Sequence, residues 1–262
     1  MIPASAASAA TWPPQWLAET AQARSSLLWR GVEAQHIVAT MRLVDTLDEQ
    51  AVLEQLLENS KPALPASLPG PVAAELPELP AIPVPHYLLS TPFRYRSPFP
   101  SRFRRPHHAG IWYGAETLRA AAAEVAYWRW RFLVDSDGLR SGELHTEHSF
   151  FQARVQGQAI DLSAAPWDSL AALWMQDRDY SATHALADAA RSAGLQWLRY
   201  ASVRENGGHC AAVFSLQALS LHLPHWPQTW HCKTTAHSVW LVREEQRYAW
   251  AFALAPNGPV MS

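Results

Sequence analysis

Residues 111–132 read IWYGAETLRAAAAEVAYWRWRF, and this stretch decides the fold class. Residues 111–113 predict a short apolar strand, and Gly114 predicts a turn directly after it. The Ala- and Trp-rich residues 116–132 then predict a well-buried helix. The chain therefore contains a strand that turns at once into a core helix.

The flanking sequence adds mainly strands. Residues 181–193 predict a second helix, with Ser181 as its N-cap and Gly194 just past its end. Residues 150–162 predict a hairpin around Gly157. Further strands are predicted at residues 197–203, 211–216, 239–243 and 248–254. Strands that follow one another with few helices between them favour an α+β fold with a largely antiparallel sheet.

The N-terminal part has a different character. The capping box at residues 46–49 predicts a short amphipathic helix, and the prolines of residues 61–85 predict an extended tether. We therefore predict a helical extension over residues 1–60, a Pro-rich tether over 61–86 and a catalytic domain over 87–262. The extension is expected to be dispensable for catalysis.

Composition restricts the class of protein. The 262 residues are 48% hydrophobic, enough for one substantial core, and the net charge of −2 argues against a polyanion as the default partner. Cys210 and Cys232 are too few for a disulfide framework. No stretch has the pattern of a signal peptide or a membrane span. We expect a soluble, cytoplasmic protein that binds neither a membrane nor, directly, a nucleic acid.

The first candidate for a binding function is the run FRYRSPFPSRFRR at residues 93–105. Guanidinium groups bind phosphate and aromatic faces stack on bases, so the run suits a nucleotide. It equally suits single-stranded nucleic acid, or a basic loop that is simply solvated. A non-enzymatic module that grips single-stranded nucleic acid is therefore the alternative function.

Two further features involve isolated polar side chains. Glu124 is the only acid between Arg119 and Phe132, and its surroundings suit either a structural ion pair or a catalytic carboxylate. Ser202 and Arg204 lie on one face of a predicted strand, where they suit a phosphate or a ribose hydroxyl, or simply a half-exposed strand edge.

Metal and cofactor motifs are weak or missing. His145 and His148 flank Thr-Glu rather than following the HExxH order of zinc proteases, so no metal site is predicted. No GxGxxG, Walker A or GxSxG sequence occurs. A dinucleotide bound outside such motifs is expected to be a consumed substrate rather than a cofactor.

Several short motifs in a fixed order resemble the RES family, which is named for an Arg, a Glu and a Ser. The similarity covers about residues 87 to 250. It differs from the commoner family pattern in the Pro-Ser turn before Arg102 and in the crowding of Arg94 and Arg96, which leaves open which of these two is the first arginine. The matching residues are Arg94, Arg102, Tyr113, Glu124, Ser202 and Arg204.

The resemblance implies an ADP-ribosyltransferase-like fold and an enzyme that consumes NAD. It implies transfer of ADP-ribose to phosphate, as in an NAD phosphorylase, or to a protein, as in an ADP-ribosyltransferase. It also implies an Xre-type antitoxin partner, and so the toxin of a type II toxin–antitoxin system. Glu124, Tyr113 and Ser202 are the expected catalytic residues. The expected phosphate-binding residues are Arg94 or Arg96, Arg102 and Arg204.

Overall fold

The computed structural model describes residues 12–34, 46, 49, 52, 53, 56, 87–222 and 227–254. The chain forms one mixed sheet flanked by helices, so the expected α+β class with a largely antiparallel sheet is confirmed. Among the described strands, only β3 and β4 pair in parallel.

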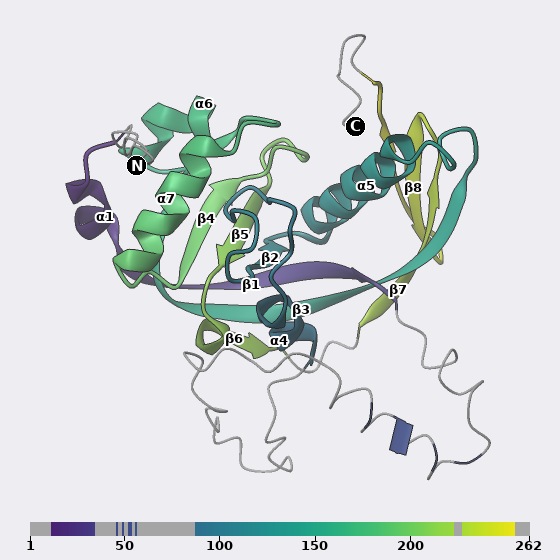
Figure 1. The fold of residues 1–262 in the computed structure, drawn as a ribbon, viewed down its shortest axis with the longest axis horizontal. Helices are drawn as coiled ribbons and strands as arrows, with labels where there is room; N and C mark the ends of the chain where they lie inside the picture. Colours follow the sequence, from purple (N-terminus) through teal and green to yellow (C-terminus); the bar gives the residue numbers. More distant parts are fainter. Residues whose placement is uncertain are drawn as a thin grey trace, which may run out of the picture.

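Two long strands organise the sheet. Strand β1 (Gln22–Glu33) pairs along its whole length with β3 (Leu144–Asp161), and the two run side by side across the molecule (Figure 1). Strands β2 (Trp112–Ala115), β5 (His209–Val213) and β4 (Trp197–Ala201) follow in the sheet. Because β4 pairs back to β3 and β2 pairs to β1, these five strands form a closed circuit.

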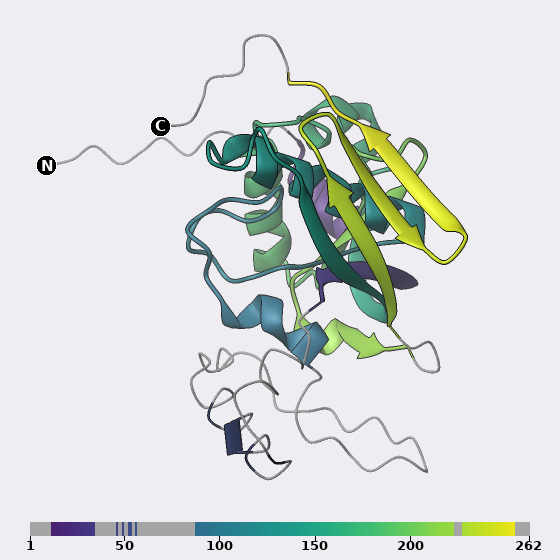
Figure 2. The ribbon, with the colours of Figure 1, turned by 90° about the vertical axis from the view of Figure 1, so that its right-hand side faces the viewer.

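The other half of β3 carries the sheet onward through β7 (Gln228–Thr234), β8 (Ser238–Arg243) and β9 (Gln246–Ala251). These three strands form the antiparallel arm that faces the viewer in Figure 2. Helix α5 (Leu118–Asp135) packs between this arm and β1. Thr117 caps α5, because its hydroxyl accepts a hydrogen bond from the Ala120 amide at 3.1 Å.

The remaining elements cover the rest of the sheet. Helix α7 (Ser181–Ser192) lies on the side of the molecule opposite α5 (Figure 1). Buried indole rings of Trp12, Trp167 and Trp174 pack together beside it. The smaller elements are α1 (Gln15–Thr20), α4 (Tyr87–Arg94), η1 (Trp167–Leu170), α6 (Ala171–Trp174), η2 (Leu216–Ala218) and β6 (Leu219–Leu221).

The predicted helical extension is wrong over residues 22–33, which form β1 instead. This strand is a full member of the sheet, so the N-terminal part is not merely helical. The capping box does form, with Thr46 and Glu49 exchanging hydrogen bonds of 3.1 and 3.2 Å. The Pro-rich tether of residues 61–86 lies outside the described residues. The division into three parts is otherwise untested and stays a prediction.

The hairpin predicted around Gly157 is also wrong. Strand β3 continues through this position without a turn. Gly157 has a φ of +156°, and a Cβ on it would lie 2.1 Å from Oε1 of Gln196. The glycine therefore admits a neighbouring side chain rather than reversing the chain.

Helix α7 confirms the predicted end of the helix at Gly194 and corrects the predicted N-cap. Gly194 has a φ of +76°, the conformation expected just past a helix end. The N-cap is Tyr180 rather than Ser181, whose amide donates to Oδ1 of Asp179 at 2.9 Å. Within the described part of the chain, no helix combines the length and the apolar character needed to cross a membrane.

Candidate active site

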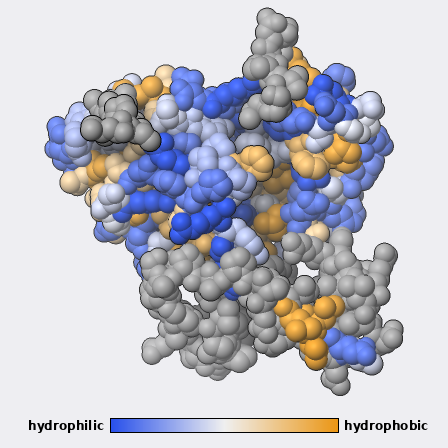
Figure 3. All heavy atoms as spheres, in the orientation of Figure 1, coloured by the Kyte–Doolittle hydropathy of each residue, from blue (hydrophilic) through white to orange (hydrophobic). Residues whose placement is uncertain are grey.

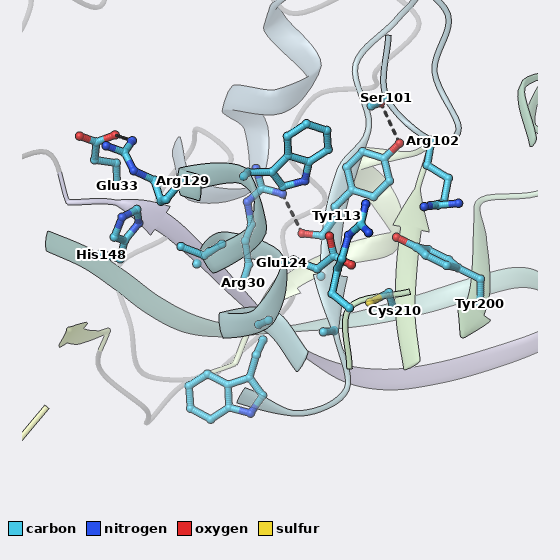
Figure 4. A pocket seen from close by; sticks show the side chains of 18 of the residues that line it. Arg30, Glu33, Ser101, Arg102, Tyr113, Glu124, Arg129, His148, Tyr200 and Cys210 are labelled. Carbon is cyan, nitrogen blue, oxygen red and sulfur yellow. Dashed lines mark hydrogen bonds and ion pairs between the residues drawn. The ribbon is translucent and has the colours of Figure 1, made fainter. Parts of the chain in front are cut away.

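A pocket of about 370 Å³ opens beside helix α5. It lies where α5, β1 and β2 meet β4, β5 and the turn at residues 101–104 (Figure 4). From the direction of Figure 3, hydrophobic side chains show in the middle of this face, with hydrophilic ones on either side. Arg102, Tyr113, Glu124 and Arg204 all line this pocket, so the structure brings together four of the residues predicted from sequence.

Glu124 projects from α5 into this pocket. Within the described part of the chain its carboxylate makes no hydrogen bond and no ion pair. Burial raises the pKa of Glu124, while the charges of Arg204 and Arg102 act in the opposite direction. The structural ion pair considered from sequence is therefore not formed. A desolvated carboxylate in a cleft is a strong candidate for a functional group.

Hydrogen bonds hold Arg102 at the pocket wall through one side-chain nitrogen and through its backbone carbonyl. Its Nη1 donates to the carbonyl oxygens of Trp174 and Gln176, both at 2.8 Å, and its guanidinium lies over the ring of Tyr180. The Thr183 hydroxyl donates to the Arg102 carbonyl. Among the described residues, Nε and Nη2 of Arg102 have no acceptor and the side chain has no carboxylate partner. The guanidinium is thus fixed in place with donors left over.

Arg30 of β1 is a pocket residue that the sequence did not reveal. Its Nη1 donates to the Tyr113 carbonyl at 2.7 Å, and its guanidinium lies over the Trp112 ring. Its Nε is buried without a hydrogen-bond partner, and burial lowers its pKa to about 10. No described carboxylate forms an ion pair with Arg30. The one available signal was a lone cation within the apolar run of residues 27–32.

Tyr113 presents its ring to the pocket while its hydroxyl is tied down. The hydroxyl lies 2.9 Å from Oγ of Ser101 and accepts from the Phe103 amide at 3.1 Å (Figure 4). Burial raises the pKa of Tyr113, so the phenol stays protonated at neutral pH. These bonds also fix the turn that carries Arg102.

Arg204 lines the pocket, and Ser202 supports it from behind. The Ser202 hydroxyl accepts hydrogen bonds from the amides of Arg204 and Glu205 at 3.2 and 3.1 Å. Arg204 pairs with Asp177 at 2.7 Å and lies over the ring of Tyr127. Ser202 is buried and does not line the pocket, so its position suits a positioning residue rather than a substrate contact.

Arg94 and Arg96 do not line the pocket, and the expectation that one of them is the first arginine of the family motif stays a prediction. Arg94 ends α4, a helix that packs on β2 and β6, and Arg96 is exposed. In the same segment the rings of Phe93 and Phe103 are buried in the core. Tyr95 and Phe99 remain exposed, so only part of the run presents aromatic rings to the surface.

The described residues show no cluster of side chains that could bind a metal ion. No group of three or more His, Cys, Asp or Glu side chains within the described ranges is arranged to hold an ion. Cys210 and Cys232 are both buried free thiols. Burial and the nearby charge of Glu124 raise the pKa of Cys210 to about 12, so this pocket thiol is protonated at neutral pH.

Comparisons with known proteins agree with the motif order. The sequence profile of the RES domain matches residues 78–233, more than half of the chain. A solved structure with a similar fold is the M. tuberculosis MbcT–MbcA toxin–antitoxin complex. It is 14% identical, with a TM-score of 0.47, and the match covers 83% of this chain and 90% of that chain. No curated protein sequence matches the chain.

Proposed function

The chain belongs to the RES-domain family, and from that premise we propose that it consumes NAD by breaking the nicotinamide–ribose bond. The observation that carries the proposal is the desolvated carboxylate of Glu124, which has no ion pair among the described residues and shares its pocket with Arg30 and Arg102, two arginines that have no carboxylate partner there either. The acceptor of the ADP-ribosyl group is phosphate or a protein. The protein is then a pentosyl-transferring enzyme with NAD as its consumed substrate.

Arg30 and Arg102 are the groups proposed to hold phosphate. Both guanidiniums are fixed by hydrogen bonds to backbone carbonyls, and both keep donors free of protein acceptors among the described residues. A buried cation without a counter-ion costs several kcal/mol unless a ligand supplies the missing charge. The pyrophosphate of NAD, or an incoming phosphate, supplies it through charge-assisted hydrogen bonds.

Glu124 is proposed to act at the reacting carbon. When the bond from the ribose C1 to the nicotinamide nitrogen breaks, the electron pair leaves with nicotinamide and positive charge develops at C1. A carboxylate desolvated in the pocket stabilises that charge better than a carboxylate in water. An oxygen of the acceptor then forms the new bond to C1, and a proton that this oxygen carries passes to solvent.

The remaining residues are proposed to position these groups. The ring of Tyr113 is free to pack on the ribose or the nicotinamide, because its hydroxyl is bonded to the turn behind it. Arg204 adds a further cation to the same pocket, and its guanidinium is already paired with Asp177. Ser202 holds the turn that carries Arg204.

Family membership also bears on partners and location. We propose that the protein is the toxin of a type II toxin–antitoxin system, that an Xre-type antitoxin binds it, and that it acts in the cytoplasm. Incubation with NAD, with and without phosphate and with a cell extract as a source of proteins, tests the acceptor. ADP-ribose 1″-phosphate indicates phosphate, and labelled protein indicates ADP-ribosyl transfer. NAD recovered intact under all conditions contradicts the proposal.

The pH profile should report the ionisation of Glu124. Burial raises the pKa of this carboxyl, so the active carboxylate is lost at a higher pH than for an exposed glutamate. As pH falls, kcat/KM for NAD should therefore drop with a midpoint above the ordinary glutamate value, and Glu124→Gln should abolish this limb. A limb that persists unchanged in the variant would assign it to another group.

Replacing Arg30 by glutamine should weaken substrate binding without unfolding the protein. Loss of a charge-assisted contact to phosphate is expected to cost about 1.5–3 kcal/mol, which corresponds to a roughly 10- to 150-fold rise in KM for NAD. Stability should not fall, because the variant removes a buried cation that has no described counter-ion.

Arg24→Gln is the matched control for this experiment. Arg24 lies on the same strand, pairs with Asp161 at 3.3 Å and does not line the pocket. Its variant should keep the wild-type KM. Equal KM values for the Arg30 variant and the wild type would remove Arg30 from the phosphate site.

A further inference from the structure

The pocket has a second end, beyond Glu124, that the proposed reaction does not use. In Figure 4 Glu33, Arg129 and His148 lie together on the side of Arg30 away from Arg102 and Tyr200. We call these three residues the distal end. They come from β1, α5 and β3, so a strand, a helix and a second strand meet there.

The backbone arrangement explains how these side chains meet. Glu33 and His148 are directly opposite each other in the β1–β3 pairing. Nη1 of Arg129 forms an ion pair of 2.9 Å with Oε2 of Glu33, whose side chain is 57% exposed. Glu33 thus engages one outer nitrogen of the guanidinium and makes no hydrogen bond to the inner nitrogen, Nε.

Two polar atoms at the distal end are buried and have no hydrogen-bond partner within the described part of the chain. They are Nε of Arg129 and Nδ1 of His148. The His148 side chain is only 3% exposed, and its other nitrogen lies 3.1 Å from Oγ1 of Thr146. The Val32 backbone is a weak hydrogen-bond contact of the ring that raises the pKa of His148, but no described group meets full hydrogen-bonding geometry at Nδ1. Burying such atoms costs free energy unless something binds them.

The charge at the distal end differs from that around Arg30 and Arg102. Arg129 is neutralised by Glu33. Burial and the charge of Arg129 lower the pKa of His148 to about 4, so its ring is neutral at physiological pH. An end with no net charge has little to attract phosphate. It retains a donor at Arg129 and, at His148, a nitrogen whose tautomer allows it to donate or accept.

We propose that the distal end binds a nitrogen heterocycle through an amide-like edge, in which a hydrogen-bond acceptor lies beside a donor. The acceptor would take the hydrogen of Arg129 Nε, and the donor would bond to His148 Nδ1. The indole rings of Trp29 and Trp128 also line the pocket and offer flat surfaces for a planar ring. The inference deepens the proposed function, because NAD has two such edges, the carboxamide of nicotinamide and the amino edge of adenine.

The test compares the wild type with His148→Phe, which keeps a ring and removes both nitrogens. With NAD the variant should show a KM raised about tenfold, because one hydrogen bond to the substrate is lost. If the bound edge is adenine, which is remote from the reacting carbon, kcat should stay nearly unchanged. Nicotinamide mononucleotide, which lacks adenosine, separates the two edges. If adenine occupies the distal end, the effect should vanish with this substrate; if nicotinamide does, it should persist.

His145→Phe is the matched control, because His145 lies on the same strand with a 65% exposed side chain outside this pocket. It should leave every constant unchanged. If His148→Phe does not fold, Arg129→Met provides the same comparison from α5. Wild-type KM values for both substrates in a folded distal-end variant would overturn the inference.

A binding measurement keeps this test separate from the proposed function. Calorimetric titration with adenosine and with nicotinamide needs no turnover, so it applies even if NAD is not consumed. One of the two compounds should bind the wild type, and His148→Phe should weaken that binding about tenfold. If neither compound binds the wild type, or the variant binds equally well, the distal end is not a heterocycle site.

Discussion

Replacing Glu124 by glutamine should lower NAD turnover by about 100-fold or more and leave thermal unfolding close to wild type. The amide keeps the shape of the side chain and loses the charge that stabilises the reacting carbon. No ion pair is broken, because the described residues provide none for this carboxylate. As the proposed toxin, the same variant should lose toxicity in cells and still bind the proposed antitoxin.

The sign of the stability effect follows from the pKa. The pKa of Glu124 is raised in the folded protein, so its ionised form disfavours folding at neutral pH. Removing the charge should leave the free energy of unfolding unchanged or slightly higher. A large drop in Tm would instead indicate that the carboxylate supports the fold.

Glu116→Gln is a matched control for the Glu124 variant. Glu116 forms hydrogen bonds of 2.7 and 2.9 Å to Arg199 and does not line the pocket. Its pair is partly exposed, so the variant should lose about 1 kcal/mol of stability and keep its turnover per folded molecule. Near wild-type NAD consumption by folded Glu124→Gln protein would sink the proposed mechanism.

Deleting residues 1–34 should abolish the folded state, which reverses the expectation that residues 1–60 are dispensable. Strand β1 pairs with β3 through every residue from Gln22 to Glu33 and also contacts β2. Losing these backbone hydrogen bonds, at about 1 kcal/mol each, removes as much as the whole stability of a typical domain, roughly 5–15 kcal/mol. Circular dichroism and solubility of the truncated chain measure the result.

A point substitution gives a graded version of the same test. Leu28 of β1 is fully buried, and Leu28→Ala should lower the free energy of unfolding by about 2–5 kcal/mol. A truncated protein that starts after Glu33, folds and consumes NAD would show that β1 is an accessory strand.

The strand–helix unit at the centre of the pocket is predictable from sequence because its signals are local. The predicted strand forms at Trp112–Ala115, with Gly114 inside it rather than at a turn after it, and α5 shows a continuous run of helix-forming residues. Tyr113 and Glu124 are therefore placed correctly on β2 and α5, and both line the pocket. The glycine past the end of α7 is equally local.

The parts that sequence did not predict depend on partners far away in the chain. Strand β1 is stabilised by pairing with β3, more than 100 residues later, and its own alternation is weak. Arg30 was not predicted as a pocket residue because it lies on this unpredicted strand. Gly157 looks like a turn locally, but its function is set by the Gln196 side chain. Nor does spacing reveal that Arg94 and Arg96 lie outside the pocket.

The release of free nicotinamide from NAD tests the central claim most directly. Purified full-length protein and Glu124→Gln protein are incubated side by side with NAD in excess, and nicotinamide is quantified over time by chromatography. The wild type should release many molecules of nicotinamide per protein molecule, and the variant about 100-fold fewer in the same time. Folded wild-type protein that leaves NAD intact, or equal release by both proteins, would contradict the claim that this pocket breaks the nicotinamide–ribose bond through Glu124.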